Sequence, residues 1–407
     1  MVQVLVDDLR LREEPGLDGK PIAALSAGQR APVVGGPQDA DGYQWYQVSL
    51  QPSGVSGWVA SGDGSTPWIA RLVNGKITAA TGRDIWSLDE NGDRELFAQL
   101  AEGWSAASHS WAQDGGSLAI SELRSDHDLG CVLEGRVAVL DDTGHVIART
   151  SPPVGSYDTD PAWSPDGSQI AFTRNPHTCA TQSQPGFDDL YVMPSTTGDA
   201  HLVVSGASGA IWSPTSDAFA FIRFNPEPTD FSELRGPEIW TIRADGTGQR
   251  LVGGRAADGS RERLRDWIGW SPDGSVLAYM RAVGDDLGTT EIDLIDMAGR
   301  MTALGSVPGH PDSITWLPDG SGVVYVENQS GLVAVVVQST SGTEIARFEQ
   351  RDGVPGYPVI VSPDGSSLAW LIQGTSNLRI QPTGGGDART FETVVRGFLT
   401  WQPLLIR

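Results

Sequence analysis

Hydrophobic residues along this chain fall into short runs that are separated by turns rich in Gly, Pro, Asp and Ser. Within the runs, apolar and polar positions alternate as they do in strands, for example at Ile170–Phe172. No long helical period and no extended apolar run is present. The pattern therefore predicts an all-β protein without a membrane-spanning segment.

One turn motif recurs along most of the chain. Its full form, Trp-Ser-Pro-Asp-Gly, places a short apolar strand before a tight turn, in which Gly tolerates a positive φ. Copies or near copies begin at Trp111, Trp163, Trp212, Trp270, Trp316 and Val361, and a stub follows at Trp401. A repeat of about forty to sixty residues indicates an architecture in which no unit buries its apolar face alone.

Each copy of the motif is followed by three more expected strands, and four strands per period are typical of a propeller blade. A small side chain recurs in the second strand, eight residues after the start of each copy. These residues are Ala119, Ala171, Ala220, Ala278, Val324 and Ala369. A small residue between bulky neighbours suits a face where two sheets approach closely, so we interpret these positions as spacers between sheets.

The number of third strands predicts how the ring closes. The third-strand pattern occurs seven times, first at Asp84–Leu88, but only six copies follow a complete motif. The chain ends with an isolated first strand at Gly397–Gln402. Placing that strand inside the first blade gives a seven-bladed β-propeller closed by a C-terminal strand, without an open sheet edge. Six blades with an irregular first segment is the alternative.

The repeated motif, with its following second and third strands, resembles the TolB-like (WD40-like) propeller repeat from Trp68 to Arg407. We therefore assign residues 67–407 to a propeller domain. The resemblance implies a wide range of functions, because such propellers occur as periplasmic scaffold proteins, as gating domains of serine peptidases and inside carbohydrate-active enzymes.

A separate unit, residues 1–66, precedes the propeller. Its short strands alternate with Gly and Pro turns, and Trp45 and Trp58 are expected in the core of a small barrel. The segments Leu11–Pro15, Trp45–Val48 and Gly57–Val59 resemble motifs of bacterial SH3-like domains. That resemblance implies either binding to cell-wall glycan or a spacer that packs against its neighbour. The linker that follows is short, so we expect the two domains to touch.

The formal charge of −23 argues against nonspecific binding to nucleic acid or to anionic lipid. Both domains resemble extracytoplasmic proteins, which predicts a periplasmic or cell-surface location. Met1 leads directly into the first expected strand, without a signal peptide. We therefore expect a trimmed or mature fragment, with a cytoplasmic protein as the alternative.

The two cysteines, Cys131 and Cys179, occupy matching places between the second and third strands of adjacent blades. A disulfide that joins these neighbouring loops is the favoured interpretation for an extracytoplasmic protein. Two free thiols are one alternative. A Cys2His2 metal site that also uses His127 and His177 is the other, although this spacing is unusual for zinc.

No motif for covalent or metal-assisted catalysis is present. The sequence lacks G-x-S-x-G, H-E-x-x-H and the phosphate-binding P-loop. We therefore assign no catalytic residue, no metal and no cofactor.

The lengths of the connections predict where a partner binds. Blades two to five carry long connections on one rim, whereas blades six and seven have short ones. The long connections are Arg124–Gly135, Asn175–Asp188, Phe224–Pro237 and Ala282–Thr290. An elaborated sector beside plain blades is where a binding surface would be built.

Three arginines, Arg174, Arg223 and Arg281, recur at the end of the second strand in successive blades. Acidic residues, Glu122 and Glu327, occupy the same place in the flanking blades. One interpretation is a set of ion pairs between blades. The other is an arc that faces an anionic ligand, and its contacts would be the three arginines together with Phe187, Phe224 and Phe231.

Together these observations predict a non-catalytic extracytoplasmic binding or scaffold module. Its partner, a protein or a cell-wall glycan, would bind the rim of blades two to five. The alternatives are a glycan-active enzyme and the regulatory propeller of a peptidase whose catalytic domain is absent.

Overall fold

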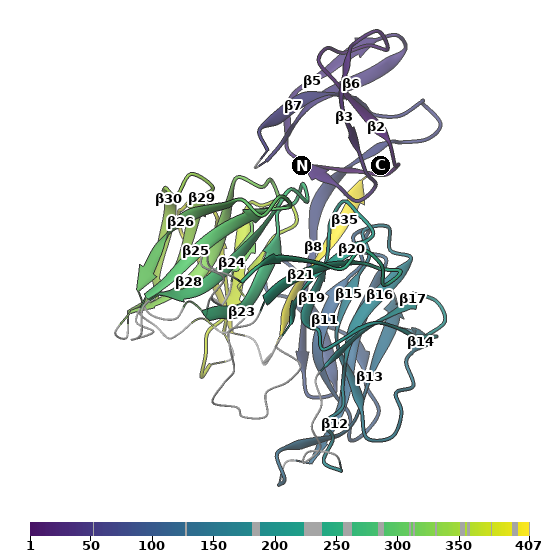
Figure 1. Cartoon of the computed structure of the whole chain (residues 1–407), viewed down its shortest axis with the longest axis vertical. Helices are drawn as coiled ribbons and strands as arrows, with labels where there is room; N and C mark the ends of the chain where they lie inside the picture. Colours follow the sequence, from purple (N-terminus) through teal and green to yellow (C-terminus); the bar gives the residue numbers. More distant parts are fainter. Residues whose placement is uncertain are drawn as a thin grey trace.

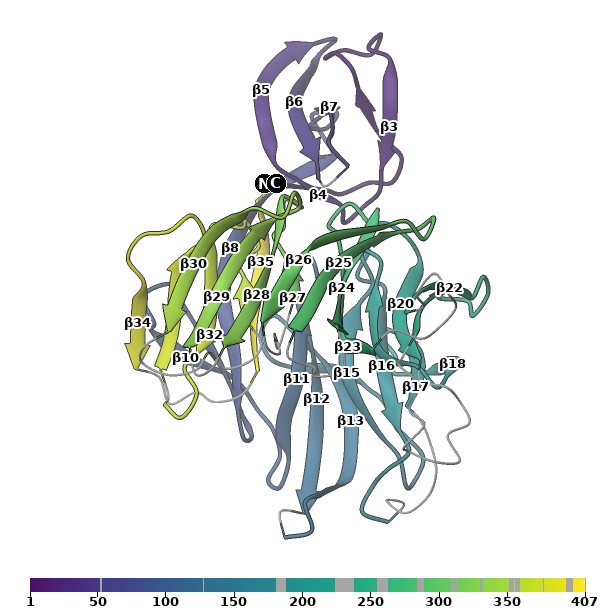
Figure 2. The same ribbon diagram turned by 60° about the vertical axis from the view of Figure 1, so that its left-hand side comes forward.

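The structure is a computed structural model. It describes residues 1–51, 53–126, 128–180, 188–223, 238–254, 263–283, 289–308, 311, 314–329, 332–350, 355, 359–375, 377–392 and 398–406. The described residues form strands and turns without a helix, which confirms the all-β prediction (Figures 1 and 2). Within them, no helix is long and apolar enough to cross a membrane.

The N-terminal domain is built on a five-stranded antiparallel sheet in the order β3-β2-β7-β6-β5. Its strands are β2 (Leu9–Arg12), β3 (Pro21–Leu25), β5 (Val33–Ala40), β6 (Tyr43–Leu50) and β7 (Val55–Ala60). Trp45 is buried, and its indole Nε1–H donates to the Ala40 carbonyl oxygen at 3.0 Å. Trp58 is only half-buried, so it contributes less to the core than the sequence predicts.

The remaining two strands of this domain, β1 (Val2–Val4) and β4 (Arg30–Ala31), belong to another sheet. β1 pairs with β4 and also with β8 (Ile69–Thr81), the long strand that enters the propeller. The side chains of Val2, Val4 and Ile69 nevertheless pack in the N-terminal core. The two domains are therefore joined by strand pairing as well as by the linker.

Six four-stranded antiparallel sheets follow in chain order and form blades two to seven. Blade two contains β11 (Ser105–Trp111), β12 (Ser117–Asp126), β13 (Cys131–Asp141) and β14 (Val146–Arg149). Blade three contains β15 (Tyr157–Trp163), β16 (Gln169–Asn175), β17 (Asp189–Pro194) and β18 (His201–Ser205). Blade four contains β19 (Ser208–Trp212), β20 (Ala218–Arg223), β21 (Glu238–Arg243) and β22 (Arg250–Gly253).

Blade five contains β23 (Arg263–Trp270), β24 (Val276–Val283), β25 (Thr289–Asp296) and β26 (Met301–Pro308). Blade six contains β27 (Ile314–Trp316), β28 (Gly322–Gln329), β29 (Leu332–Ser339) and β30 (Glu344–Gln350). Blade seven contains β31 (Ile360–Val361), β32 (Ser367–Leu371), β33 (Asn377–Pro382) and β34 (Arg389–Glu392). In each of these blades the first strand is innermost.

The C-terminal strand completes blade one. β35 (Leu399–Ile406) pairs with β8, which pairs in turn with β9 (Asp84–Leu88), and β9 pairs with β10 (Arg94–Gln99). The predicted placement of the last strand is thus confirmed, although the strand continues past Gln402. The innermost strands contact one another in the cyclic order β35, β11, β15, β19, β23, β27 and β31, and β31 contacts β35. The ring is therefore closed through strands from both ends of the propeller. Figure 2 shows two of these strands, β8 and β35, side by side.

The propeller core lies between the blades. Each junction between neighbouring blades has its own cluster of buried hydrophobic side chains. The predicted spacers Ala119, Ala171, Ala220, Ala278, Val324 and Ala369 all belong to these clusters and are 0–1% exposed. Ala171, for example, packs with Trp212 and Phe219 of the next blade. The spacer interpretation is therefore confirmed.

The motif tryptophans add a hydrogen bond across several of these junctions. The indole Nε1–H donates to the backbone carbonyl that precedes the tryptophan of the previous blade. These pairs are Trp163–Ser110, Trp212–Ala162 and Trp316–Gly269, each at 3.0 Å. The Trp270 indole nitrogen is buried but has no hydrogen-bond partner within the described structure.

This difference between the motif tryptophans predicts unequal effects of one substitution. Trp163→Phe removes the indole donor and leaves the Ser110 carbonyl without it, so we expect a loss of about 1–2 kcal/mol in the free energy of unfolding. Trp270→Phe is the matched control and should cost clearly less, because no hydrogen bond is lost. Urea unfolding of both variants measures the difference. An equal loss in the two variants would contradict the hydrogen-bond account.

Candidate functional site

The two faces of the ring differ in what covers them. The turns that follow the innermost strands form one face, and the N-terminal domain sits on it (Figure 1). A Cβ atom on Gly28 would lie 2.9 Å from the Pro165 carbonyl oxygen, and the Ser53 N–H donates to Asp273 Oδ2 at 3.4 Å. The connections between second and third strands leave from the opposite face, where the β12–β13 hairpin extends away from the N-terminal domain (Figure 1). We call this opposite face the connection face.

A disulfide ties two blades together on the connection face. Cys131 and Cys179 are bonded, with their Cα atoms 5.3 Å apart, as the sequence predicts. The Cys179 N–H also donates to the Val132 carbonyl oxygen at 2.8 Å. Cys179, at the start of the connection after β16, is thereby fixed to the β12–β13 hairpin. The metal and free-thiol alternatives for these cysteines are wrong, since both sulfurs are in the disulfide.

The first of the three predicted arginines is fully engaged. Arg174 binds Asp158 with two hydrogen bonds, Nε to Oδ1 at 2.7 Å and an Nη to Oδ2 at 2.9 Å. Asp158 is completely buried and the Arg174 side chain is 13% exposed. The guanidinium also stacks 4.2 Å from the ring centre of Tyr191. This geometry neutralises the buried carboxylate within blade three.

The other two arginines differ from each other. Arg281 forms ion pairs with Asp293 and Glu291 of the adjacent strand β25. Arg223 donates to the Ser205 carbonyl oxygen at 3.0 Å and lies 5.4 Å from the ring centre of Trp240. Burial lowers the pKa of Arg223, with Glu238 opposing that shift.

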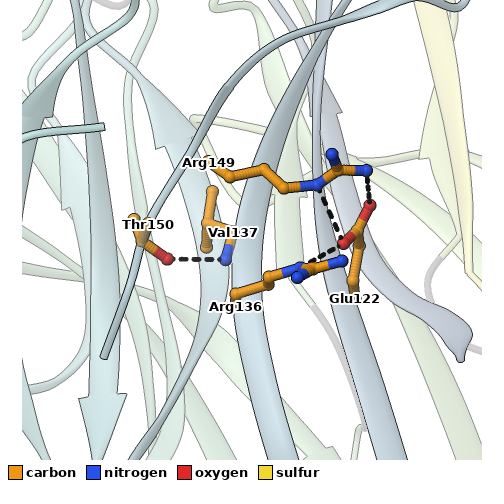
Figure 3. A network of polar contacts seen from close by, with 5 residues as sticks. All are labelled: Glu122, Arg136, Val137, Arg149 and Thr150. Atoms are coloured by element: carbon orange, nitrogen blue, oxygen red, sulfur yellow. Dashed lines mark hydrogen bonds and ion pairs between the residues drawn. The ribbon is translucent and has the colours of Figure 1, made fainter. Parts of the chain in front are cut away.

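The acidic residues at the same position in the flanking blades are paired as well. Glu122 is buried and accepts hydrogen bonds from Arg136 Nε at 2.5 Å and from Arg149 at 3.0 Å (Figure 3). Glu327 pairs with Arg347 at 2.7 Å. Each of these partners lies in the same blade as its glutamate. The expectation of ion pairs between blades is therefore wrong for these residues, because neighbouring strands of one sheet bring the charges closer than adjacent sheets do.

The predicted arginines thus do not form one open arc. Two of the three guanidinium groups already bind carboxylates, which reduces their attraction for an anionic ligand. Phe187, Phe224 and Phe231 lie outside the described residues. Binding of a ligand by these six residues stays a prediction.

A polar cluster that the sequence did not indicate lies at the junction of blades two and three. Burial, followed by the nearby Asp160 carboxylate, raises the pKa of Asp188 to about 6. Asn175 Nδ2 donates to Asp188 Oδ1 at 2.7 Å. Burial and the two carboxylates also raise the pKa of Tyr157. A carboxylic acid with a raised pKa can act as a proton donor closer to neutral pH.

Asp160 has a backbone conformation that is uncommon for its type. Its φ is 55°, at a bulge in the innermost strand β15. The Asp160 N–H is held by the hydroxyl oxygens of Ser108 and Ser121, at 3.0 and 3.1 Å. Both serines belong to blade two, so the neighbouring blade stabilises the strained residue. A turn-prone Asp within a strand segment was the signal that could have identified this position.

A cavity of about 600 Å³ lies on the ring axis beneath the N-terminal domain. Its wall is formed by the motif residues of several blades, Trp111, Trp212, Trp270, Trp316, Trp401, Pro214, Pro272, Pro318, Pro363 and Pro403. Gly28 and Arg30 of the N-terminal domain also line it. Sequence analysis missed the cavity because the motif tryptophans indicated only a structural repeat.

Metal ligation has no support in the described part of the chain, which holds no group of three or more His, Cys, Asp or Glu side chains arranged for a metal ion. The nearest approach to catalytic machinery there is the pair Asp160 and Asp188, and neither residue lines the central cavity.

Comparison with known proteins identifies the smaller unit. Residues 7–65 match the family model of the bacterial SH3 domain. The N-terminal domain is therefore a bacterial SH3 domain, as its motifs predict. A comparison of the whole chain with curated proteins gave no match.

Solved structures are similar to most of the chain. The β-propeller domain of Cps50 (Swd1) from Myceliophteria thermophila is 14% identical, with a TM-score of 0.51 over 73% of this chain and 89% of that chain. The periplasmic gluconolactonase PpgL of Pseudomonas aeruginosa is 13% identical, with a TM-score of 0.52 over 82% and 99% of the two chains. TolB from Acinetobacter baumannii is 17% identical, with a TM-score of 0.46 over 82% of each. At these identities, the first two similarities support the propeller fold alone.

The raised pKa of Asp188 predicts a pH-dependent effect of its removal. Because its pKa is higher in the folded than in the unfolded state, the ionised carboxylate destabilises the fold, and this penalty grows as the pH rises from about 4 to above 6. Asp188→Asn should therefore raise the melting temperature at pH 7.5 by about 2 °C, and the gain should vanish near pH 4. Thermal unfolding at both pH values tests this, with the exposed Asp142→Asn as control. A gain that persists or increases at pH 4 would contradict the assignment.

Proposed function

We propose that this protein is an extracytoplasmic binding module that holds a protein partner on the connection face, opposite the SH3 domain, without performing chemistry on it. The observation that carries the proposal is a group of large apolar side chains exposed on that face. They are Leu129 (68% exposed), Leu133 (41%), Val154 (105%) and Phe398 (47%). Large exposed apolar side chains on one face of a soluble domain can take part in protein interaction sites.

Their surroundings favour a protein over an anionic polymer. Leu129 and Leu133 flank the start of β13, where the disulfide holds the hairpin to blade three. A covalently fixed surface loses less conformational entropy on binding than a free loop. Arg124 in the same hairpin is paired with Glu134 at 2.6 Å, so its charge is already balanced. The apolar residues are therefore the main source of binding energy at this site.

The SH3 domain acts in this proposal as a cap rather than as the binding site for the partner. It rests on the turn face of the propeller, and its strand β1 is paired with β8. This placement covers one face and leaves the connection face for the partner.

The proposed location outside the cytoplasm rests on the disulfide, because such bonds persist in oxidising compartments. The similar propeller PpgL is described as periplasmic, which agrees with that location.

A glycan-active enzyme is the second candidate function, and the pair Asp160 and Asp188 favours it. Asp188, whose pKa is raised by burial and by the nearby Asp160 carboxylate, would donate a proton, and Asp160 would accept one. Release of reducing sugar from cell-wall glycan by the wild-type protein, lost in Asp188→Asn, would support the enzyme over the binding module.

Site-specific photo-crosslinking tests the binding surface. A photoreactive amino acid replaces Leu129 or Val154 on the connection face, or Thr247 in an exposed turn on the opposite face as the matched control. We expect one envelope protein to be captured through positions 129 and 154 and not through 247. The Cys131→Ser/Cys179→Ser double variant should reduce this capture several-fold, because the hairpin is then no longer fixed. Capture through position 247 alone would show that the partner binds the other face.

A further inference from the structure

The central cavity has a mostly apolar wall with few polar groups. Besides the tryptophans and prolines, the innermost strands contribute Ile211, Ile268 and Ile314 to its lining. Blade three is absent from the lining, because Gly28 of the SH3 domain packs over Pro165 at that place. A volume of about 600 Å³ falls within the range of small-molecule sites, which are also mostly apolar with a few placed polar groups.

Arg30 is the charged residue that the SH3 domain adds to this lining. It lies on β4 opposite Gln3 of β1, and its Nε–H donates to Gln3 Oε1 at 3.3 Å. No carboxylate of the described residues forms an ion pair with it. Arg174, Arg281 and Arg347, in contrast, each bind at least one carboxylate. Burial lowers the pKa of Arg30 to about 10, so the group is still cationic at neutral pH.

A second polar group beside the cavity also lacks a partner. Gln113 lines the cavity, and its Oε1 atom is buried without a hydrogen-bond donor among the described residues. This Oε1 atom lies close to the SH3 domain, 3.3 Å from the place that a Cβ atom on Gly28 would occupy. A buried acceptor without a donor destabilises a protein unless a ligand completes it, and a half-buried cation without a carboxylate partner can bind an anion.

We propose that the central cavity is a binding site for a small organic carboxylate that also carries a hydrogen-bond donor. The Arg30 guanidinium binds the carboxylate through its two terminal nitrogens, and Gln113 Oε1 accepts the hydrogen bond from the ligand. The indole and proline rings cover the apolar body. This site is distinct from the connection face, and it depends on both domains because the SH3 domain supplies the charge.

The apolar wall favours an organic carboxylate over a small inorganic anion such as phosphate. Inorganic phosphate is strongly hydrated and would gain nothing from the tryptophan and proline rings, whereas an organic body removes apolar surface from water. Arginine also matches the planar geometry of a carboxylate with two parallel hydrogen bonds.

Binding of mandelate, which combines a phenyl ring, a hydroxyl and a carboxylate, tests the proposal on the full-length protein. Its neutral analogue 1-phenyl-1,2-ethanediol and inorganic phosphate serve as comparison probes. Saturation-transfer NMR and titration calorimetry should show that mandelate binds more tightly than either. Arg30→Gln should weaken mandelate binding about ten- to a hundredfold and leave the diol unaffected. Arg10→Gln, on the exposed face of β2, should change nothing.

Three results would overturn the proposal. The first is mandelate binding of equal strength in wild type and Arg30→Gln, and the second is no mandelate binding by the wild type at about 10 mM. The third comes from unfolding without ligand: Arg30→Met should keep or raise the melting temperature, because it removes an unpaired cation while retaining the apolar stem. A fall of several degrees would show that Arg30 serves the fold and not a ligand.

Discussion

Strand β8 is the element on which the arrangement of both domains depends, because strands from both ends of the chain pair with it in addition to its hairpin partner β9. Arg71 pairs with Val2 of β1 on one edge and with Ile406 of β35 on the other. Farther along, Ile77 lies between Trp401 of β35 and Leu88 of β9. Both edges of β8 are thereby covered, which closes the ring and removes an aggregation-prone sheet edge. The same pairing fixes the SH3 domain to the propeller.

This fixed attachment gives the two faces of the ring different roles. The SH3 domain covers the turn face and roofs the central cavity, where it places Arg30. The connection face keeps its exposed apolar side chains and the disulfide between blades two and three. In the interior of the blades, buried acids such as Asp158 and Glu122 are neutralised by arginines of the same sheet. These paired charges therefore stabilise the fold. Arg30 differs from them, because it lines the central cavity and forms no ion pair with a carboxylate of the described residues.

Sequence patterns predicted the elements that repeat, and they failed where contacts depend on the register of particular strands. The period of the motif indicated the blades, the spacer alanines such as Ala171 and the closing strand, since each recurs at a fixed place. The matching positions of Cys131 and Cys179 predicted their disulfide for the same reason. The partners of Arg174 and Glu122 depend on which residues lie opposite each other within a sheet. Arg30 has no signal in the sequence, because its position over the propeller follows from the docking of two domains.

Native-state hydrogen exchange of the shared strand tests this account most directly. Exchange followed by mass spectrometry compares peptides that cover β1, β8 and β35 with the central strand β16 of blade three. We expect the amides of β1, β8 and β35 to exchange as slowly as those of β16, through one global opening, because none of the paired strands can leave alone. Rapid exchange in β1 or β35, while β16 stays protected, would show that β8 does not hold the domains and the ring together.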